Sequence, residues 1–454
     1  MNSESAPNSG ATLVIGLGAS GKAIARQLRL EGCEVVAVDD SPDEGAIATA
    51  EELGIVLVER PGVAELARVA RNAAEVVVSP GIPFHHPIFS VSGIATPVSE
   101  VEMAWRRATA PIIAITGTNG KTTVATLVTR MLQCSGIRAE VGGNIGVPLT
   151  EVVAAASAEV IVAEVSSFQL ALCEGFKPRV GVWLNAGEDH LDWHPDLGHY
   201  VRSKARIWQN QDACDVAVAN AEDEMVMLSA SKTKGRLVTF GLEDGDFRLS
   251  AEGLLSPDGG LIIALSEIRR AMNFEISNAL AACAASLAAG ASIDGCRRAL
   301  AGFNGLPHRV ELVRDVGGVR YIDDSKATTP AAVLAAVRAF NSVVLIAGGR
   351  NKGLSMAELA DGVGHLRGVV AIGEAASEIE KVFKGLSPVV TAGSMAAAVE
   401  VAASMAVAGD VVLLSPACAS FDWYASYADR GEDFKRAVHA LRSPVGTAAN
   451  LEGE

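Results

Sequence analysis

The sequence predicts an α/β protein of three domains. Short apolar runs alternate with helix-like segments in three successive blocks, which is the pattern of mostly parallel sheets covered by helices. The chain has 454 residues, enough for two to four hydrophobic cores. Polar and glycine-rich segments follow the predicted strands, where α/β proteins bind their ligands. We place the domains at residues 1–107, 108–306 and 307–454.

The first block opens with a strand, Thr12–Ile15, followed by the glycine motif Gly16-x-Gly18-x-x-Gly21 and a helix to about Leu30. A second strand, Glu34–Val38, ends at Asp39. A glycine turn at a helix N-terminus suits a diphosphate, and an acid at the end of the next strand suits a ribose or base. We expect a Rossmann-like domain. Its glycine turn and Asp39 would suit a UDP group as well as NAD.

The second block contains a phosphate loop, Thr116–Thr123, between the apolar strand Ile112–Ile115 and a helix over Val124–Cys134. Backbone N–H groups in such a loop wrap a nucleotide phosphate, and the helix dipole favours the negative charge. Lys121 adds a positive charge and Thr122 a hydroxyl for Mg²⁺. We therefore expect a central P-loop ATPase domain with a mostly parallel sheet; an ordinary glycine-rich turn is the alternative.

Further polar residues follow strands of the second block. Glu164 ends the apolar run Val160–Ala163, where its carboxylate would serve as a Mg²⁺ ligand or cap a helix. His190 follows two acids after the strand Val180–Asn185, which favours a site over a structural histidine. The segment from Asp246 to Leu265 is expected to be antiparallel.

The third block repeats the alternation, so we expect a second Rossmann-like domain. Its strands are predicted at Val319–Ile322, Val343–Ile346, Val369–Ile372 and Val411–Leu414. Lys326 and Lys352 follow strand ends, and cations there suit an anionic substrate. Arg309 lies at the junction with the second domain.

Composition excludes several classes of protein. The formal net charge is −15, so binding of nucleic acid through bulk charge is not expected. The seven cysteines include no CxxC pair, which favours a reducing compartment over disulfides or structural zinc. Neither a signal pattern nor an apolar run of membrane-spanning length is visible. We expect a soluble, cytoplasmic monomer.

Several motifs in fixed order resemble those of the Mur ligase family, the ATP-dependent amide ligases that build the peptidoglycan peptide. The resemblance covers nearly the whole chain. It rests on Gly117–Thr122, Gly142–Gly146, Glu164–Gln169, Asn185–Asp192, Leu306–Arg309, Asp324–Thr328 and Leu414–Ser420. The implied substrates are UDP-N-acetylmuramoyl-L-alanine and D-glutamate, joined through an acyl phosphate at the expense of ATP.

The resemblance also implies roles for individual residues. ATP would be bound by Gly117, Thr118, Asn119, Gly120, Lys121, Thr122, Thr123, Asn278, Arg309 and Asp324. The UDP substrate would contact Gly18, Ala19, Ser20, Asp39, Gly81, Asn144 and His190. D-Glutamate would contact Lys326, Thr328, Lys352, Ser420 and Tyr424. Two Mg²⁺ ions would use Thr122, Glu164, His190 and a carbamylated Lys204, and these side chains with Lys121 would be catalytic. Without the resemblance, Lys204 would be predicted to be a solvated surface lysine.

The chain departs from the family pattern at two places. Phe274 and Glu275 stand where His-Asn is usual before the alanine-rich helix, which Asn278 opens, and Thr329 stands where Asn is common. The first change concerns the adenine contacts. The alternatives are another Mur-type amide ligase with a different amino acid, or an NAD-dependent oxidoreductase that uses Gly16–Gly21.

Overall fold

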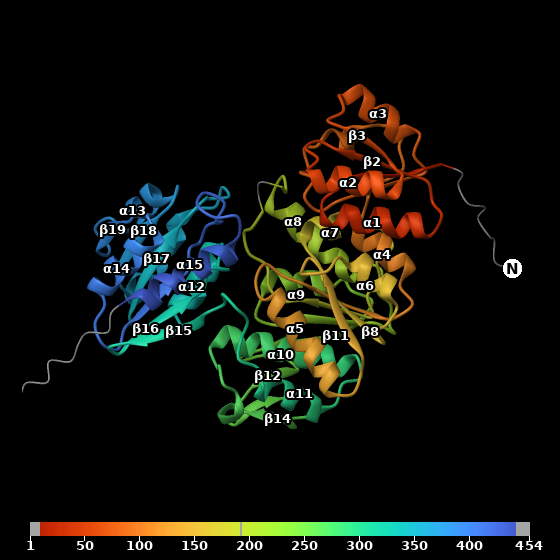
Figure 1. Ribbon diagram of the computed structural model, residues 1–454. Coiled ribbons are helices and arrows are strands. Elements are labelled where there is room, and N and C mark those ends of the chain that lie inside the picture. The colour runs from red at the N-terminus through yellow and green to blue at the C-terminus, as the bar shows by residue number, and fades with distance from the viewer. Residues whose placement is uncertain (1–9, 191–192, 442–454) are drawn as a thin grey trace, which may run out of the picture. The chain divides into compact units, whose positions relative to one another are not determined.

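The computed structural model describes residues 10–190 and 193–441 and contains three α/β sheets (Figure 1). The chain divides into two compact units. One comprises Met1–Ala186, Trp193–Ala271 and Glu275–Phe303, and the other Gly187–Asp192, Met272–Phe274 and Asn304–Glu454. The first unit holds the first two sheets and the second unit holds the third.

The first sheet has five strands in the order β3-β2-β1-β4-β5, all parallel. Its strands are β1 (Thr12–Ile15), β2 (Val35–Asp39), β3 (Val56–Glu59), β4 (Glu75–Val78) and β5 (Val98–Ser99). The helices are α1 (Ala19–Leu30), α2 (Glu44–Leu53), α3 (Val63–Arg71), the 3-10 helix η1 (Pro87–Ser90) and α4 (Glu100–Arg107). Both faces of β1 are buried, with Val14 in one apolar cluster and Leu13 and Ile15 in another. The expected Rossmann-like arrangement is confirmed.

The second sheet has nine strands in the order β14-β13-β12-β11-β10-β9-β6-β8-β7. They are β6 (Ile112–Thr116), β7 (Ala139–Gly143), β8 (Val160–Glu164), β9 (Val180–Trp183), β10 (Val216–Asn220), β11 (Arg236–Gly241), β12 (Phe247–Leu249), β13 (Gly253–Leu255) and β14 (Leu261–Ala264). The helices are α5 (Lys121–Cys134), α6 (Leu149–Ala155), α7 (Ser167–Ala171), α8 (Leu197–Ala205), η2 (Arg206–Trp208), α9 (Glu224–Ala230), η3 (Leu265–Glu267), α10 (Asn273–Ala288) and α11 (Ile293–Ala301). As expected, pairing is parallel except between β12, β13 and β14.

Successive residues of β6 alternate between the two faces of this sheet. Ile113 and Ile115 pack in one apolar cluster with α5 and α10, whereas Ile112 and Ala114 pack in another on the opposite face. A strand covered by helices on both sides reads as a continuous apolar run. In the same unit, α1 and α4 contact α6, which brings the first sheet's helices against the second domain (Figure 1).

The third sheet has six strands in the order β15-β16-β20-β17-β18-β19, with only β15 antiparallel to its neighbour. The strands are β15 (Glu311–Val316), β16 (Val319–Asp323), β17 (Val343–Gly348), β18 (Leu366–Ile372), β19 (Val389–Thr391) and β20 (Val411–Leu414). The helices are α12 (Pro330–Val337), η4 (Met356–His365), α13 (Ala376–Phe383), α14 (Met395–Met405) and α15 (Tyr427–Ala440). This sheet is mostly parallel with an antiparallel edge.

The structure adds elements that the apolar pattern did not reveal. Strands β3, β5, β7, β15 and β19 were not predicted, because they are short or carry polar and exposed residues, as does β15. Helix α10 begins at Asn273, five residues before the predicted start at Asn278.

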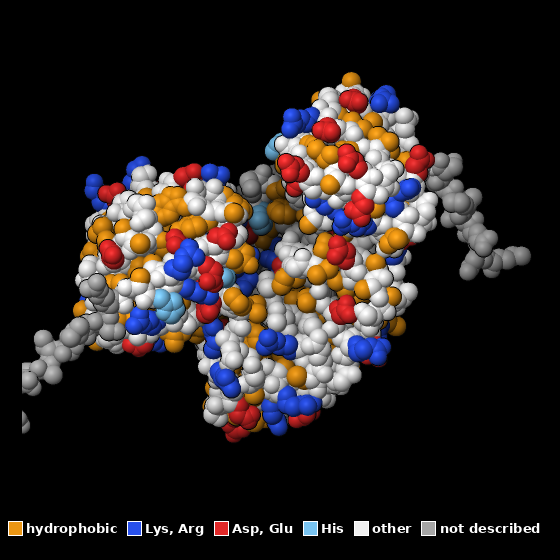
Figure 2. Space-filling view, in the orientation of Figure 1, with side chains coloured by type: hydrophobic (Ala, Val, Ile, Leu, Met, Phe, Trp, Pro, Cys, Tyr) orange, Lys and Arg blue, Asp and Glu red, His pale blue; other side chains and the backbone are white. Residues whose placement is uncertain are grey.

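Surface properties agree with the composition. Acidic and basic side chains are interspersed over the visible face (Figure 2). Within residues 10–190 and 193–441, no helix combines the length and the apolar character needed to cross a membrane. All seven cysteines are free thiols, as expected for a chain without a disulfide framework.

Candidate active site

The phosphate loop connects β6 to α5 and is fixed by hydrogen bonds with Asn185 and with Lys121. Gly120 precedes α5 with φ +85°, a left-handed conformation that favours glycine. Asn185, after β9, accepts from Thr118 N at 3.1 Å through its backbone oxygen and from Asn119 N at 2.8 Å through Oδ1. Lys121 Nζ donates to Gly117 O at 2.7 Å and to Thr118 O at 3.0 Å. The cation therefore lies over the loop that would receive the phosphates.

Asn278 of α10 also approaches this loop. A side-chain carbon placed on Gly120 would collide with Asn278 Oδ1. The neighbouring Glu275 forms an ion pair with Arg270 at 2.6 Å, so the residue that departs from the family pattern has a charged partner in its own unit. Phe274, which belongs to the second compact unit, packs against the apolar core of that unit.

Thr122 and Glu164, predicted as Mg²⁺ ligands, lie in direct contact. Thr122 Oγ1 donates to Glu164 Oε2 at 2.8 Å, and Asn144 Nδ2 donates to Glu164 Oε1 at 3.0 Å. Glu164 is buried and does not cap a helix, because Ser166 and Gln169 form the capping box of α7. A hydroxyl and a carboxylate are hard oxygen ligands beside a phosphate loop, a donor set that fits Mg²⁺.

Lys204 is buried against the same loop, so the surface alternative is wrong. The side chain is 2% exposed, and its Nζ donates to Gly117 O at 2.9 Å and to Thr116 Oγ1 at 3.4 Å. The ammonium also lies 4.7 Å from the centre of the Tyr200 ring, whose hydroxyl is 2.8 Å from Thr118 Oγ1. Helix α8 thus brings a lysine to the phosphate loop from 83 residues further along the chain than Lys121.

His190 lies at the edge of the described chain, because Leu191 and Asp192 of its motif fall outside it. Its backbone is in the left-handed region, with φ +56°. Its N–H donates to Asp189 Oδ1 at 2.9 Å, and its ring Nε2 lies 3.3 Å from Asp189 Oδ2. His190 belongs by its contacts to the second unit, so its place relative to Glu164 and Lys204 is left as a prediction.

A cavity of about 480 Å³ lies between the glycine motif of the first domain and the second domain. Its lining includes five residues predicted to bind the UDP substrate: Gly18, Ala19, Ser20, Gly81 and Asn144. Gly18 precedes α1 and no side chain caps that helix, so its first N–H groups are available to an anion. Asp39, which is not among the lining residues, accepts from Leu17 N at 2.7 Å and so fixes the glycine loop.

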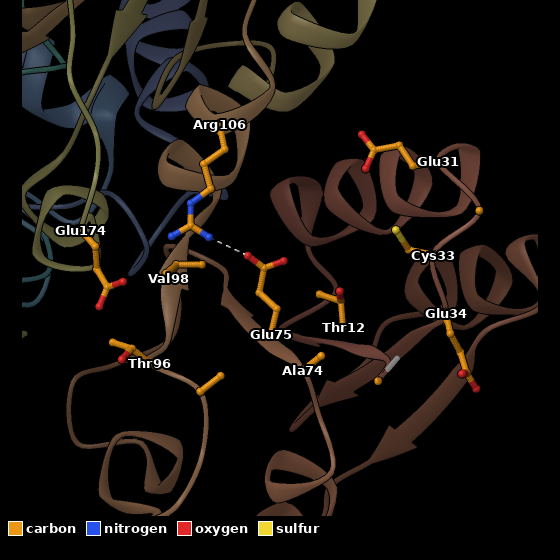
Figure 3. Close-up of a pocket in the computed structure, with 13 residues that line it drawn as sticks. Thr12, Glu31, Cys33, Glu34, Ala74, Glu75, Thr96, Val98, Arg106 and Glu174 are labelled. Atoms are coloured by element: carbon orange, nitrogen blue, oxygen red, sulfur yellow. Dashed lines mark hydrogen bonds and ion pairs between the residues drawn. The ribbon is translucent and has the colours of Figure 1, made fainter. Parts of the chain in front are cut away.

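A larger cavity of about 730 Å³ lies near the amino ends of the first sheet's strands (Figure 3). Its wall carries Glu31, Glu34, Glu75 and Glu174, and Arg106 pairs with Glu75 at 2.9 Å. This acidic wall would repel a diphosphate, and ligands of parallel α/β sheets bind at the carboxyl ends of strands. The smaller cavity is therefore the candidate substrate site.

In the third domain, Asp324 follows β16 and is buried. Its Oδ2 accepts from Ser415 Oγ at 2.8 Å and its Oδ1 from Val310 N at 3.2 Å. Burial raises the pKa of Asp324 to about 7, although these hydrogen bonds and the charge of Arg309 lower it. Arg309 lies between two residues with positive φ, His308 at +60° and Val310 at +48°. Such strain in non-glycine residues is typical of functional sites.

The five residues predicted for D-glutamate lie at strand ends and loops of this domain. Lys326 Nζ lies 3.8 Å from the centre of the Tyr427 ring. The hydroxyl of Tyr424 donates to Asp433 at 2.8 Å. Tyr427, the first residue of α15, was not named from the sequence, because its contact with Lys326 is a tertiary one. Ser420 is buried, whereas Thr328 and Lys352 are partly exposed.

Two family models match this chain. The Mur ligase middle domain matches residues 115–286, and the Mur ligase, glutamate ligase domain matches residues 308–418. These ranges contain the phosphate loop, Glu164, Arg309 and Lys326. The chain belongs to the Mur ligase family.

The chain is similar to bacterial proteins named UDP-N-acetylmuramoylalanine–D-glutamate ligase. The protein from Geobacter metallireducens is 40% identical, with 94% of this chain and 97% of that protein aligned. The protein from Desulfosudis oleivorans is 42% identical, with 95% of this chain and 96% of that protein aligned.

Solved structures support the fold. UDP-N-acetylmuramate-alanine ligase from Thermotoga maritima superposes with a TM-score of 0.58 at 19% identity, covering 95% of this chain and all (100%) of that one. MurF from Acinetobacter baumannii gives a TM-score of 0.60 at 18% identity, covering 94% and 92%. The predicted family and α/β fold class are confirmed.

Proposed function

We propose that this protein is an ATP-dependent ligase that joins D-glutamate to UDP-N-acetylmuramoyl-L-alanine. Relatives of this name align over nearly the whole chain at about 40% identity. The observation that carries the proposal is the position of Asn144, which lines the substrate cavity and donates to Glu164 at 3.0 Å. One amide therefore links the cavity for the UDP substrate to the carboxylate beside the phosphate loop.

The chemistry follows from this arrangement. The substrate carboxylate attacks the γ-phosphorus of ATP, ADP leaves, and an acyl phosphate forms. The amine of D-glutamate then attacks the acyl carbon; phosphate leaves, the nitrogen loses a proton, and an amide remains. Both reactants of the first step are anions, so Lys121 and the loop N–H groups must offset their repulsion.

Thr122 and Glu164 are the residues that would hold a first Mg²⁺, which when bound supplies charge to the ATP phosphates. His190 and Lys204 are proposed for a second ion. Carbamylation would convert the Lys204 ammonium into a carboxylate, and the burial of this side chain beside Gly117 supports the assignment. Proposed nucleotide contacts also include Asn278, Arg309 and Asp324.

For D-glutamate we propose the remaining cations and hydroxyls of the third domain. Lys326 and Lys352 would face the two carboxylates, with Thr328 and Ser420 as hydrogen-bonding groups. Tyr427 is a better candidate than Tyr424, because its ring contacts Lys326. The domain limits, the monomeric state and the cytoplasmic location remain proposals from the sequence.

Phosphate release in the presence of ATP, Mg²⁺, UDP-N-acetylmuramoyl-L-alanine and one amino acid at a time tests this function. We expect release with D-glutamate and not with L-alanine, L-lysine or meso-diaminopimelate. Release with another amino acid would assign the protein to a different Mur ligase. Tight binding of NADH, with none of the UDP substrate, would favour the oxidoreductase alternative.

A further inference from the structure

Trp193 connects the second domain to the wall of the substrate cavity. Its side chain is almost buried, 8% exposed, and its indole Nε1–H donates to Ile82 O at 2.8 Å. The two residues are 111 positions apart in sequence and lie within the same compact unit. A buried tryptophan normally finds an acceptor for this N–H. Here the acceptor belongs to the cavity wall.

Ile82 ends a turn that is fixed at its other end by the glycine motif. Ser79 Oγ donates to Gly16 O at 2.6 Å, and Ile82 N donates to Ser79 O at 3.1 Å. Ser79, Gly81 and Ile82 all line the 480 Å³ cavity. The turn therefore has one attachment in the first domain, through Ser79, and one in the second domain, through Trp193.

The Trp193 ring is itself positioned by residues that belong to both walls. Its centre lies 5.3 Å from the ring of Phe84, which follows the turn, and 4.9 Å from the ring of Phe168. Phe168 is the neighbour of Gln169, another cavity residue on α7. The imidazole of His194 lies 4.6 Å away. The indole thus bridges the turn of one wall and the α7 segment of the other.

We propose that Trp193 is a positioning residue for the UDP substrate: it sets the distance between the Ser79–Ile82 turn and the α7 segment that carries Gln169, two parts of the cavity wall. The proposal rests on the proposed function, because it assumes that a UDP-linked carboxylate spans this cavity. Such a substrate must contact both parts of the wall at once, so its affinity depends on the spacing between them. Ordinary core packing, by contrast, would affect stability alone.

The variant Trp193→Phe tests the role of the N–H while keeping an aromatic ring. We expect Kd and KM for UDP-N-acetylmuramoyl-L-alanine to rise about five- to tenfold, the range given by loss of one hydrogen bond. The KM values for ATP and D-glutamate and kcat should change less than about twofold. The Kd is measured by titration without ATP, so it does not depend on turnover.

Trp208→Phe is the matched control. Trp208 Nε1 donates to Gly181 O at 2.8 Å and its ring is 2% exposed, but neither residue lines the cavity. This variant loses the same type of buried bond, so it should lower Tm at least as much as Trp193→Phe and leave the Kd for the UDP substrate unchanged. Phe84→Leu provides a second variant, since Phe84 is 37% exposed, and a rise of about threefold in that Kd is expected.

Unchanged Kd values in folded Trp193→Phe and Phe84→Leu proteins would overturn the proposal. So would equal losses for all three substrates, which indicate a general structural role. These outcomes differ from failure of the proposed function itself, in which the wild-type protein would neither bind the UDP substrate nor release phosphate with D-glutamate.

Discussion

Asp324→Asn should stabilise the protein at neutral pH and have no effect in acid. Burial raises the pKa of Asp324 from its ordinary value of 3.8 to about 7 in the folded protein. A raised carboxyl pKa means that the native state favours the protonated form. Its contribution to stability is therefore fully present below pH 3.8 and is lost as the pH rises to about 7.

The magnitude follows from the same values. Each pH unit between the unfolded and folded pKa costs about 1.4 kcal/mol, so the carboxylate lowers the free energy of unfolding by about 4 kcal/mol above pH 7. Asparagine keeps an acceptor for Val310 N and presents an amide to Ser415 Oγ, which accepts as readily as it donates. The variant should avoid the cost of a buried charge without leaving either partner unsatisfied.

Urea denaturation of the wild type and of Asp324→Asn at intervals from pH 4 to pH 8.5 measures the difference in their free energies of unfolding. The other titrating groups are the same in both proteins, so their contributions largely cancel in this difference. We expect the variant's advantage to grow from near zero to about 4 kcal/mol. Asp315→Asn removes a charge from an exposed aspartate at the end of β15 and should show no such trend. A difference for Asp324→Asn that is flat with pH, or largest in acid, would refute the reasoning.

Three further variants test other parts of the account. Lys204→Ala should reduce kcat/KM by about 100-fold or more, an effect of about 3 kcal/mol, measured by phosphate release; wild-type activity would exclude the carbamate. Lys352→Ala should raise the KM for D-glutamate about tenfold and barely change that for ATP; the reverse would move this lysine to the nucleotide site. Glu102→Ala should lower the free energy of unfolding by about 3 kcal/mol, because the buried carboxylate accepts from Gly175 N and Phe176 N at 3.0 and 2.8 Å. A loss below 1 kcal/mol in urea denaturation, a threshold of about one ordinary hydrogen bond, would contradict that account.

The sequence was most informative where function lies at strand ends. Thr122 and Glu164 were predicted to meet because they follow apolar runs, and β6 and β8 are indeed adjacent and parallel. Parallel strands bring their carboxyl ends to one edge, so a local pattern is enough to place both side chains. Gly18 and Gly81, which the family resemblance assigned to the UDP substrate, line one cavity because they follow the adjacent parallel strands β1 and β4.

Other features depend on packing between distant segments and leave no local pattern. Lys204 looks like a solvated helical lysine, because its burial depends on how α8 lies against the phosphate loop. The bond between Trp193 and Ile82 joins two loops. The family resemblance suggested Tyr424 for the amino-acid site, whereas the ring that contacts Lys326 is that of Tyr427. The positions of these side chains depend on tertiary contacts rather than on local propensity.

Transfer of an oxygen atom tests the central claim most directly. The substrate UDP-N-acetylmuramoyl-L-alanine is prepared with ¹⁸O in its carboxylate and incubated with enzyme, ATP, Mg²⁺ and D-glutamate. If the carboxylate attacks the γ-phosphorus, one ¹⁸O atom must leave with each phosphate when the amide forms, and ³¹P NMR detects it. Amide formation with ¹⁸O-free phosphate, or labelled AMP in place of labelled phosphate, would contradict the account.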